Sequence, residues 1–254
     1  MPLKATAHIE AMSAFALANF GGFGRPTLAQ NESAFPPSRR AIEAGRDAVA
    51  RSHLYPDPDW SLLRDAIART YGVERDLILC GAGPGADVLG TDYAYNFAAS
   101  AAARVGATYV KAREHGFEVS IDAILAALTP ATRIVFVCNP GNPTGTRIKN
   151  AELLRLRAAL PGDVLLMIDQ AYGEFDDQDP QAVFALAGRG DTVVLRSLSK
   201  AYGLAGARIG WGLFAPPVAA QVRKMQNSNQ VSTVSLAMAV AAIEDQAYMR
   251  STVA

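Results

Sequence analysis

Lys200 stands in the segment SLSKAYGLAGAR, which combines an amine with several groups that bind anions. The segment begins just past the apolar run 192–195, a predicted strand. A lysine that is partly desolvated and lies near another cation has a lowered pKa, and its neutral amine is then a nucleophile. Ser197 and Ser199 offer hydroxyl groups and Arg208 offers several N–H donors, so the segment predicts a phosphate-binding loop that carries a reactive amine. Taken alone, it is also compatible with a surface lysine in a polar loop.

Asp169 follows the apolar run 164–168. A carboxylate in that position lies at the edge of a sheet, where burial is costly unless a cation or a hydrogen-bond donor meets it. A protonated pyridine nitrogen is one such partner, and the phenol of Tyr172 is close enough in sequence to reach a ring oxygen of the same ligand. Taken alone, Asp169 is equally compatible with a helix cap or a metal ligand, although no histidine accompanies it as a second ligand.

The segment NPGNPTG, residues 139–145, is a compound turn after a third apolar run. Proline fixes φ and glycine permits positive φ, so the turn is able to hold its side chains in a defined direction. We predict that it points the amide of Asn142 into the crevice beyond the strand ends, as a hydrogen-bond donor to a phenolate oxygen.

Short apolar runs alternate with helical patterns along the chain. Two helices are predicted between residues 38 and 71, on either side of the YPDP break, because proline does not continue a helix. Asp59 or Ser61 is predicted to cap the second of them. Further helices are predicted over 120–128, 150–160 and 235–248, and strands over 77–80, 107–110, 134–138, 164–168, 192–195 and 209–213.

This order of elements indicates an α/β fold with a mostly parallel sheet sandwiched by helices. In such sheets the ligand site lies beyond the carboxyl ends of the strands. Four predicted strand ends are followed by polar or glycine-rich segments, namely GAGPGAD, NPGNPTGT, DQAYGEF and SLSKAYGLAGAR. We therefore expect these four segments to form one site.

The composition excludes several classes of partner. Lys and Arg number 24, and Asp and Glu also number 24, so no net charge attracts nucleic acid or an anionic membrane. No stretch approaches the ~20 apolar residues of a membrane helix, and the first twenty residues lack the pattern of a signal peptide. Cys80 and Cys138 both stand in apolar runs, which favours buried thiols and a reducing compartment. We expect a cytoplasmic protein with no nucleic-acid or membrane partner and no metal.

Three of these segments together resemble the class I and II aminotransferases of fold type I, most closely the histidinol-phosphate aminotransferase branch. The matching stretches are VCNPGNPTG, IDQAYGEF and RSLSKAYGLAGARIGWG, and NESAFPPS resembles the N-terminal arm of that branch. Their order and spacing agree as well, with 27 positions from Asn142 to Asp169, 31 to Lys200 and 8 more to Arg208. The resemblance runs from about residue 26 to the end of the chain.

The resemblance implies a pyridoxal 5'-phosphate (PLP) enzyme that transfers an amino group to a 2-oxo acid. Lys200 would hold the cofactor as a Schiff base and later move a proton, and Asp169 would keep the ring nitrogen protonated, which makes the ring an electron sink. Asn142 and Tyr172 would bind the ring oxygen O3'.

The remaining roles also follow from the resemblance. Ser197, Ser199 and Arg208 would bind the phosphate, together with the turn that contains Gly85 and Ala86, where free N–H groups meet the anion. Tyr93 would stack on the cofactor ring. Tyr55 would reach the phosphate of the neighbouring subunit, which implies a homodimer with shared active sites.

The chain departs from the family in two places. After GAGPGAD the family has a full helix, whereas here the next strand begins at once. The chain ends at Ala254, before the arginine that binds the substrate carboxylate in the family. We expect an N-terminal arm over 1–36, a PLP-binding large domain over 37–232 and the start of a truncated small domain over 233–254.

Three readings of the function stay open at this point. The first is an aminotransferase acting on an amino acid or on an amino-alcohol phosphate such as histidinol phosphate. The second is a PLP-dependent decarboxylase of the same branch, similar to threonine-phosphate decarboxylase. The third is a catalytically impaired, truncated paralogue that acts as a binding or assembly module. A dinucleotide-binding protein is disfavoured, because GAGPGA lacks both the G-x-G-x-x-G spacing and the acidic residue about 20 positions on.

Overall fold

A mixed seven-stranded sheet forms the centre of the computed structural model, which describes residues 31–80, 88–226 and 229–254. The strand order within these residues is β1-β7-β6-β5-β4-β2-β3. Only β7 runs antiparallel to its neighbours β1 and β6, and the other neighbouring pairs are parallel. The strands are β1 (Ile78–Cys80), β2 (Val88–Thr91), β3 (Tyr109–Ala112), β4 (Ile134–Cys138), β5 (Leu165–Asp169), β6 (Thr192–Ser197) and β7 (Gly210–Phe214).

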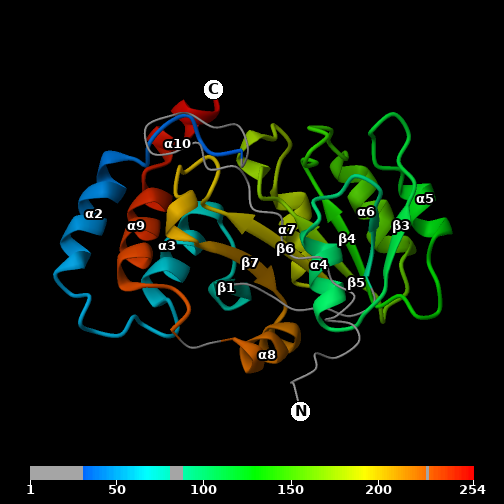
Figure 1. Ribbon diagram of the computed structural model, residues 1–254, viewed down its shortest axis with the longest axis horizontal. Helices are drawn as coiled ribbons and strands as arrows, with labels where there is room; N and C mark the ends of the chain where they lie inside the picture. Colours follow the sequence, from blue (N-terminus) through cyan, green and yellow to red (C-terminus); the bar gives the residue numbers. More distant parts are fainter. Residues whose placement is uncertain (1–30, 81–87, 227–228) are drawn as a thin grey trace, which may run out of the picture.

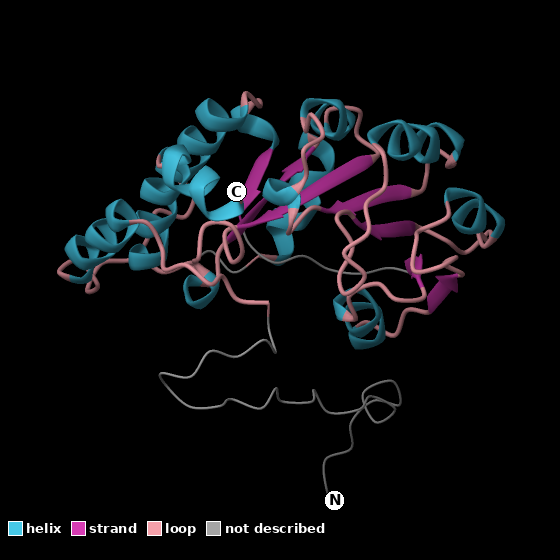
Figure 2. Ribbon diagram, turned by 90° about the horizontal axis from the view of Figure 1, so that it is seen from above, coloured by secondary structure: helices cyan, strands magenta, loops and turns pink. Residues whose placement is uncertain are grey.

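Helices lie on both sides of this sheet (Figure 2). Figure 1 shows α2 and α9 side by side at one end of the molecule, with α5 and β3 at the other end. The α-helices are α2 (Arg39–Val49), α3 (Ser61–Tyr71), α4 (Phe97–Arg104), α5 (Ile121–Ala126), α6 (Asn150–Ala159), α7 (Gln181–Ala187), α8 (Pro216–Met225), α9 (Thr233–Glu244) and α10 (Gln246–Val253). Three 3-10 turns are η1 (Arg75–Leu77), η2 (Gly173–Phe175) and η3 (Ala205–Ala207). The predicted fold class, a mostly parallel sheet sandwiched by helices, is confirmed.

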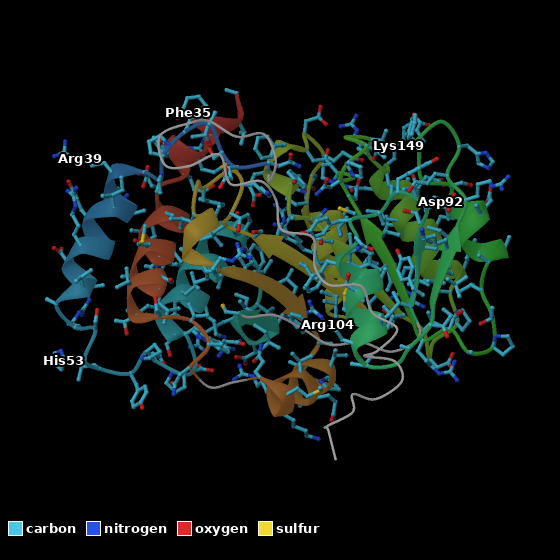
Figure 3. The ribbon with its side chains drawn as sticks, viewed as in Figure 1. Phe35, Arg39, His53, Asp92, Arg104 and Lys149 are labelled. Atoms are coloured by element: carbon cyan, nitrogen blue, oxygen red, sulfur yellow. The ribbon has the colours of Figure 1, made fainter. Side chains whose placement is uncertain are left out.

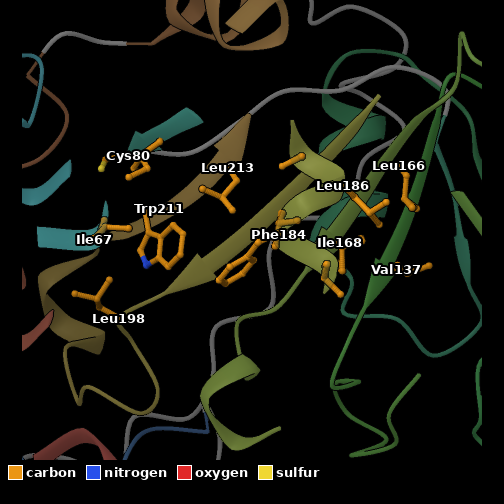
Figure 4. Packing of buried hydrophobic residues seen from close by; sticks show 14 of the residues in the cluster. Ile67, Cys80, Val137, Leu166, Ile168, Phe184, Leu186, Leu198, Trp211 and Leu213 are labelled. Atoms are coloured by element: carbon orange, nitrogen blue, oxygen red, sulfur yellow. The ribbon is translucent and has the colours of Figure 1, made fainter. Parts of the chain in front are cut away.

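The two faces of the sheet are covered unequally. Alternate strand residues such as Ile168, Val194 and Leu213 belong to the main core, a large cluster of buried apolar side chains beneath α3, α5, α6, α7 and α9. Figure 4 shows part of this cluster, with Trp211 and Phe184 at its centre. The opposite face carries two smaller clusters, one under α4 and one under α8. The main core therefore supplies most of the apolar burial that fixes the strand ends.

The predicted break between the first two helices is confirmed, but its cap differs from the prediction. No side chain caps α3 at its N-cap residue Trp60, which adopts a left-handed conformation with φ of 51°. Instead, the carboxylate of Asp57 accepts hydrogen bonds from the backbone N–H groups of Asp59 (2.9 Å) and Ser61 (2.8 Å). These bonds hold the pKa of Asp57 below its ordinary value. The Asp-Pro turn thus satisfies its own donors before the helix begins.

The predicted C-terminal helix over 235–248 is two helices in the structure. Asp245 ends α9 and its side chain caps α10 by accepting from the N–H of Tyr248. Helix α9 packs against α2 so closely that a Cβ on Gly45 would lie 2.7 Å from Cγ of Met238. Helices α4, α7 and α8 were not predicted.

Candidate functional site

The carboxyl ends of the parallel strands meet at one edge of the sheet, and the predicted site residues follow them. Asp169 ends β5, Ser197 ends β6, and Asn142 lies in the turn after β4. Strand β7 runs the other way and therefore begins at this edge, which places Arg208 there too, two residues before Gly210. Asp92, directly after β2, lies in the upper part of Figure 3, on the same side as Lys149 and opposite Arg104.

Lys200 lies beside Tyr172 and the N-terminal arm. Its Nζ donates a hydrogen bond to the backbone oxygen of Asn31 (2.9 Å) and lies 5.4 Å from the centre of the Tyr172 ring. Burial lowers the pKa of the Lys200 amine, the carboxylate of Glu32 raises it, and the guanidinium of Arg208 lowers it further. The net direction is downward, which favours the nucleophilic neutral amine that the sequence predicts.

The phenol oxygen of Tyr172 accepts hydrogen bonds from two side-chain amides. It accepts hydrogen bonds from Nδ2 of Asn31 (3.0 Å) and from Nδ2 of Asn142 (3.4 Å). Burial raises the pKa of Tyr172, and the bond from Asn31 partly offsets this. Asn142 thus lies where the sequence predicted it, with its amide directed at an oxygen at the carboxyl edge. Asn31 is a site residue that the prediction missed.

One carboxylate oxygen of Asp169 is hydrogen-bonded to the backbone, and the residue lines a cavity. Oδ1 accepts from the N–H of Ala171 (2.9 Å), whereas Oδ2 has no hydrogen-bond partner in the described part of the chain. Burial raises the pKa of this carboxyl, and the Ala171 bond opposes the shift. A half-satisfied carboxylate in such surroundings favours a cationic or N–H-bearing ligand.

Asp169, Ser197 and Arg208 line one end of a cavity of about 490 Å³. Most of the remaining lining is apolar, and the cavity runs along the thinly covered sheet face between α4 and α8, past Met167 and Leu195. The hydroxyl of Ser197 accepts from the N–H of Ser199 (3.0 Å), which bends the chain toward Lys200. The cavity therefore combines a carboxylate, a hydroxyl and a guanidinium at the carboxyl edge.

A second cavity of about 500 Å³ lies beside Tyr172. Asn31, Asn142 and Tyr172 line it, together with Arg147 and two acidic residues. Arg147 is 46% exposed at its side chain and forms ion pairs with Asp176 and Asp177, so its charge is already neutralised. Five predicted site residues thus line two cavities: Asp169, Ser197 and Arg208 line one, and Asn142 and Tyr172 line the other.

Two aromatic residues that follow β2 have different neighbours, and the predicted stacking of Tyr93 on the cofactor stays a prediction. The ring of Tyr93 packs against the ring of Phe117, with 5.2 Å between centroids. Tyr95, two residues on, is the phenol that contributes electrostatically to the raised pKa of Tyr172. Tyr95 is 51% exposed, and sequence reasoning overlooked it although it stands in the same DYAYN segment.

Tyr55 is not joined to this group, and two further predicted residues cannot be placed. The side chain of Tyr55 is 86% exposed, on the loop between α2 and α3. Gly85 and Ala86 lie outside the described residues. No group of three or more His, Cys, Asp or Glu side chains in the described ranges is arranged to hold a metal ion.

The sequence matches the family Aminotransferase class I and II over residues 27–254. The chain belongs to the class I and II aminotransferase family. Among curated members of this aminotransferase family, it is 40% identical over 232 residues to the histidinol-phosphate aminotransferase of Jannaschia sp., and 39% identical over 247 residues to that of Zymomonas mobilis. These matches cover 86% and 90% of this chain, but 64% and 67% of the relatives. The chain thus spans about two thirds of their length.

Solved aminotransferase structures share the fold. The histidinol-phosphate aminotransferase of Sinorhizobium meliloti, solved in complex with pyridoxal-5'-phosphate, superposes with a TM-score of 0.86 at 28% identity, over 98% of this chain and 73% of that one. The aspartate aminotransferase of Rhizobium meliloti gives a TM-score of 0.80 at 20% identity, over 99% of this chain and 74% of that one, which bears on the fold alone. No helix in the described part of the chain reaches the length and apolarity needed to cross a bilayer.

Proposed function

We propose that this chain binds PLP through Lys200 and carries out PLP-dependent amino transfer. The observation that carries the proposal is the convergence of Lys200, Asp169 and the Asn142–Tyr172 pair at one sheet edge. Lys200 Nζ lies 5.4 Å from the Tyr172 ring centre, and the Tyr172 oxygen accepts from Asn142. Membership of the aminotransferase family and the PLP complex of the Sinorhizobium relative support the same cofactor.

The donor set fits this cofactor. The unpartnered Oδ2 of Asp169 suits a protonated pyridine nitrogen, which would relieve the burial of that carboxylate. Ser197 and Arg208, in the same cavity, suit a phosphate dianion because a hydroxyl and a guanidinium both donate hydrogen bonds to it. We propose Ser199 as a further phosphate ligand. The part played by Gly85 and Ala86 stays a prediction.

When bound, PLP supplies an aldehyde that accepts the amino group and a ring that stabilises negative charge at the substrate α-carbon. Asp169 would keep the ring nitrogen protonated, and Asn142 and Tyr172 would hold the ring oxygen. The amine of Lys200 has a pKa lowered by burial, so it is suited to take a proton from the α-carbon and return it one atom away. We propose Tyr95 rather than Tyr93 beside the ring, because the ring of Tyr93 already packs against Phe117, whereas the phenol of Tyr95 adds to the raised pKa of Tyr172.

The substrates that we propose are an amino acid or histidinol phosphate as donor and a 2-oxo acid as acceptor. The histidinol-phosphate aminotransferases among the relatives support this class. Arg147 is neutralised by Asp176 and Asp177, which leaves it poorly suited to bind the substrate carboxylate. An amino-donor screen with analysis of the products separates amino transfer from loss of carbon dioxide.

We also propose a cytoplasmic homodimer in which Tyr55 completes the partner's phosphate site. The 86% exposure of Tyr55 supports this, because its own protomer leaves the ring uncovered. The two cysteines of the chain are buried and unpaired, which supports a reducing compartment. The division into an arm over 1–36, a large domain over 37–232 and a further domain from 233 stays a prediction. Sedimentation that gives a monomer would contradict the dimer.

The experiment that tests the cofactor proposal is chemical trapping. The chain is mixed with PLP, reduced with borohydride and digested, and the labelled lysine is found by mass spectrometry. We expect the label on Lys200, and we expect Lys200→Ala to abolish it. Lys149→Ala is the matched control, because Lys149 is an exposed lysine outside the proposed site and its loss should leave the label unchanged. A label on another lysine, or none, would contradict the assignment.

A further inference from the structure

A buried ion pair lies under the sheet edge that carries the candidate site. Nη1 of Arg196, in β6, lies 2.9 Å from Oε1 of Glu174, in η2, and each side chain is only 2% exposed. Arg196 alternates with Leu195 and Ser197 along β6, and its guanidinium lies against the rings of Tyr71 and Phe184, on the main-core face of the sheet. The pair thus joins two segments from beneath the site.

Two tyrosines extend this pair into a chain of hydrogen bonds. The hydroxyl of Tyr71, in α3, donates to the same Oε1 of Glu174 (3.0 Å) and lies 2.5 Å from the hydroxyl of Tyr202. Tyr202 also accepts from Nε2 of Gln246, in α10 (3.0 Å). Burial raises the pKa of both phenols, to about 12 for Tyr202, so both stay neutral and retain a donor proton.

Close packing fixes the guanidinium within this network. Its central carbon lies 5.7 Å from the ring centre of Tyr71 and 5.2 Å from that of Phe184, which favours a cation–π arrangement on both rings. Gly173 approaches so closely that a Cβ there would lie 2.5 Å from the same carbon. The arginine therefore has no room to adopt a second position without moving its neighbours.

Three members of the network stand within two residues of a candidate site residue. Arg196 directly precedes Ser197, Glu174 stands two residues after Tyr172, and Tyr202 stands two residues after Lys200. The N–H of Phe175 bonds to the carbonyl of Tyr172, which attaches η2 to that residue. A shift of the ion pair is thus transmitted over one or two peptide units to the phosphate-binding, ring-oxygen and amine positions.

We infer that Arg196, Glu174 and Tyr202 are positioning residues, which set the mutual placement of Lys200, Tyr172 and Ser197 from the core side of the sheet. This inference rests on the proposed PLP function. A buried ion pair adds little net stability compared with an apolar pair of the same shape, but it permits far fewer arrangements. The network is therefore better suited to fix a geometry than to hold the fold together.

The test measures the rate at which Lys200 captures PLP, followed by the absorbance of protein-bound cofactor over a range of pH. We expect Glu174→Gln to slow capture by at least tenfold and to move the pH midpoint of the reaction, because misplaced reacting groups lose rate steeply. Tyr202→Phe should show a smaller change in the same direction. Borohydride trapping identifies the modified lysine in each variant.

Arg157 offers a matched control for stability. Its guanidinium is also buried, at 1% exposure, and donates to four backbone oxygens, among them those of Val164 and Asp191. These oxygens stand at the start of β5 and β6, at the edge opposite Lys200. Arg157→Met should lower the thermal midpoint as a network variant does, yet leave the capture rate and its pH midpoint within twofold of wild type.

A double variant separates position from stability. Arg196→Met with Glu174→Gln leaves no unpaired buried charge, so its thermal midpoint should recover relative to Arg196→Met alone. Its capture of PLP should stay slow if the network positions the site. Recovery of the capture rate together with the thermal midpoint would overturn the inference, as would wild-type capture by Glu174→Gln.

The two proposals fail in different ways. A wild-type chain that carries no label on Lys200 overturns the proposed function and this inference with it. Wild-type labelling of Lys200 combined with undiminished capture in Glu174→Gln and the double variant overturns the positioning role alone.

Discussion

Gly173→Ala inserts one methyl group at the tightest point beneath the candidate site. The new Cβ would lie 2.5 Å from Cζ and Nη1 of Arg196 and 2.9 Å from its Nε. Because ordinary contacts of this kind are about 3.5 Å, the guanidinium must move by about 1 Å. It cannot do so freely, since the rings of Tyr71 and Phe184 flank it and Nη1 holds Glu174 at 2.9 Å.

The size of the effect follows from these contacts. Overpacking a core by one methyl group typically costs about 1–3 kcal/mol, and parting one partner from a buried ion pair costs about 3–5 kcal/mol. The lower entropy of alanine in the unfolded chain offsets about 0.4–1 kcal/mol. We expect the free energy of unfolding to fall by about 2–5 kcal/mol.

Urea unfolding followed by the fluorescence of the two buried tryptophans, Trp60 and Trp211, measures this change. The matched control is Gly206→Ala, because Gly206 also lies in a 3-10 turn but a Cβ added there would meet no heavy atom within 4 Å. We expect the control to be neutral or slightly stabilising. A loss below about 1 kcal/mol for Gly173→Ala would refute the reasoning, because it would mean that Arg196 is free to move aside.

Three further predictions concern the site and the core. Burial raises the pKa of Asp169 from 3.8, so its negative charge disfavours the folded state above that raised pKa. Asp169→Asn should therefore be more stable than wild type at pH 7 and equally stable below about pH 3.9, as urea unfolding at the two pH values will show. The same variant should bind PLP more weakly in a titration. Tyr95→Ala should weaken PLP retention on dialysis more than Tyr93→Ala, and the opposite order would support Tyr93, the residue predicted from the sequence. Burial raises the pKa of Cys80 and Cys138 to about 12, so an alkylating reagent should modify both only on unfolding, and rapid labelling of the native chain would contradict their burial.

The sequence alone was sufficient to predict where the residues that follow the strand ends lie. Runs such as 134–138 and 164–168 are continuously apolar, which is typical of buried parallel strands, and the polar segments after them must lie at the carboxyl edge whatever the detailed packing. Asp169 and Asn142 were therefore placed correctly at that edge. The PLP roles assigned to them came from the family resemblance, and they stay proposals.

Contacts between segments far apart in the chain could not be predicted from the sequence. Asn31 meets Tyr172 across 141 positions, and the direction of β7, which returns Arg208 to the site edge, depends on its pairing with both β6 and β1. The contact between the rings of Tyr93 and Phe117 likewise joins two segments, and the sequence alone does not show whether Tyr93 or Tyr95 makes it. Local patterns carry no information on such partners, because each partner's position is set by the packing of the whole sheet.

The sequence by itself therefore determined the order of the elements, the fold class and the chemical groups at the sheet edge, because apolar periodicity and turn chemistry act over a few residues. Only the tertiary structure decided how those groups face one another. It divided five of the predicted site residues between two cavities, and it placed the buried Arg196–Glu174 pair beside the residues that line them. The physical reason is that a buried charge is stable only where a distant segment supplies its partner, and that partner exists only once the chain has folded.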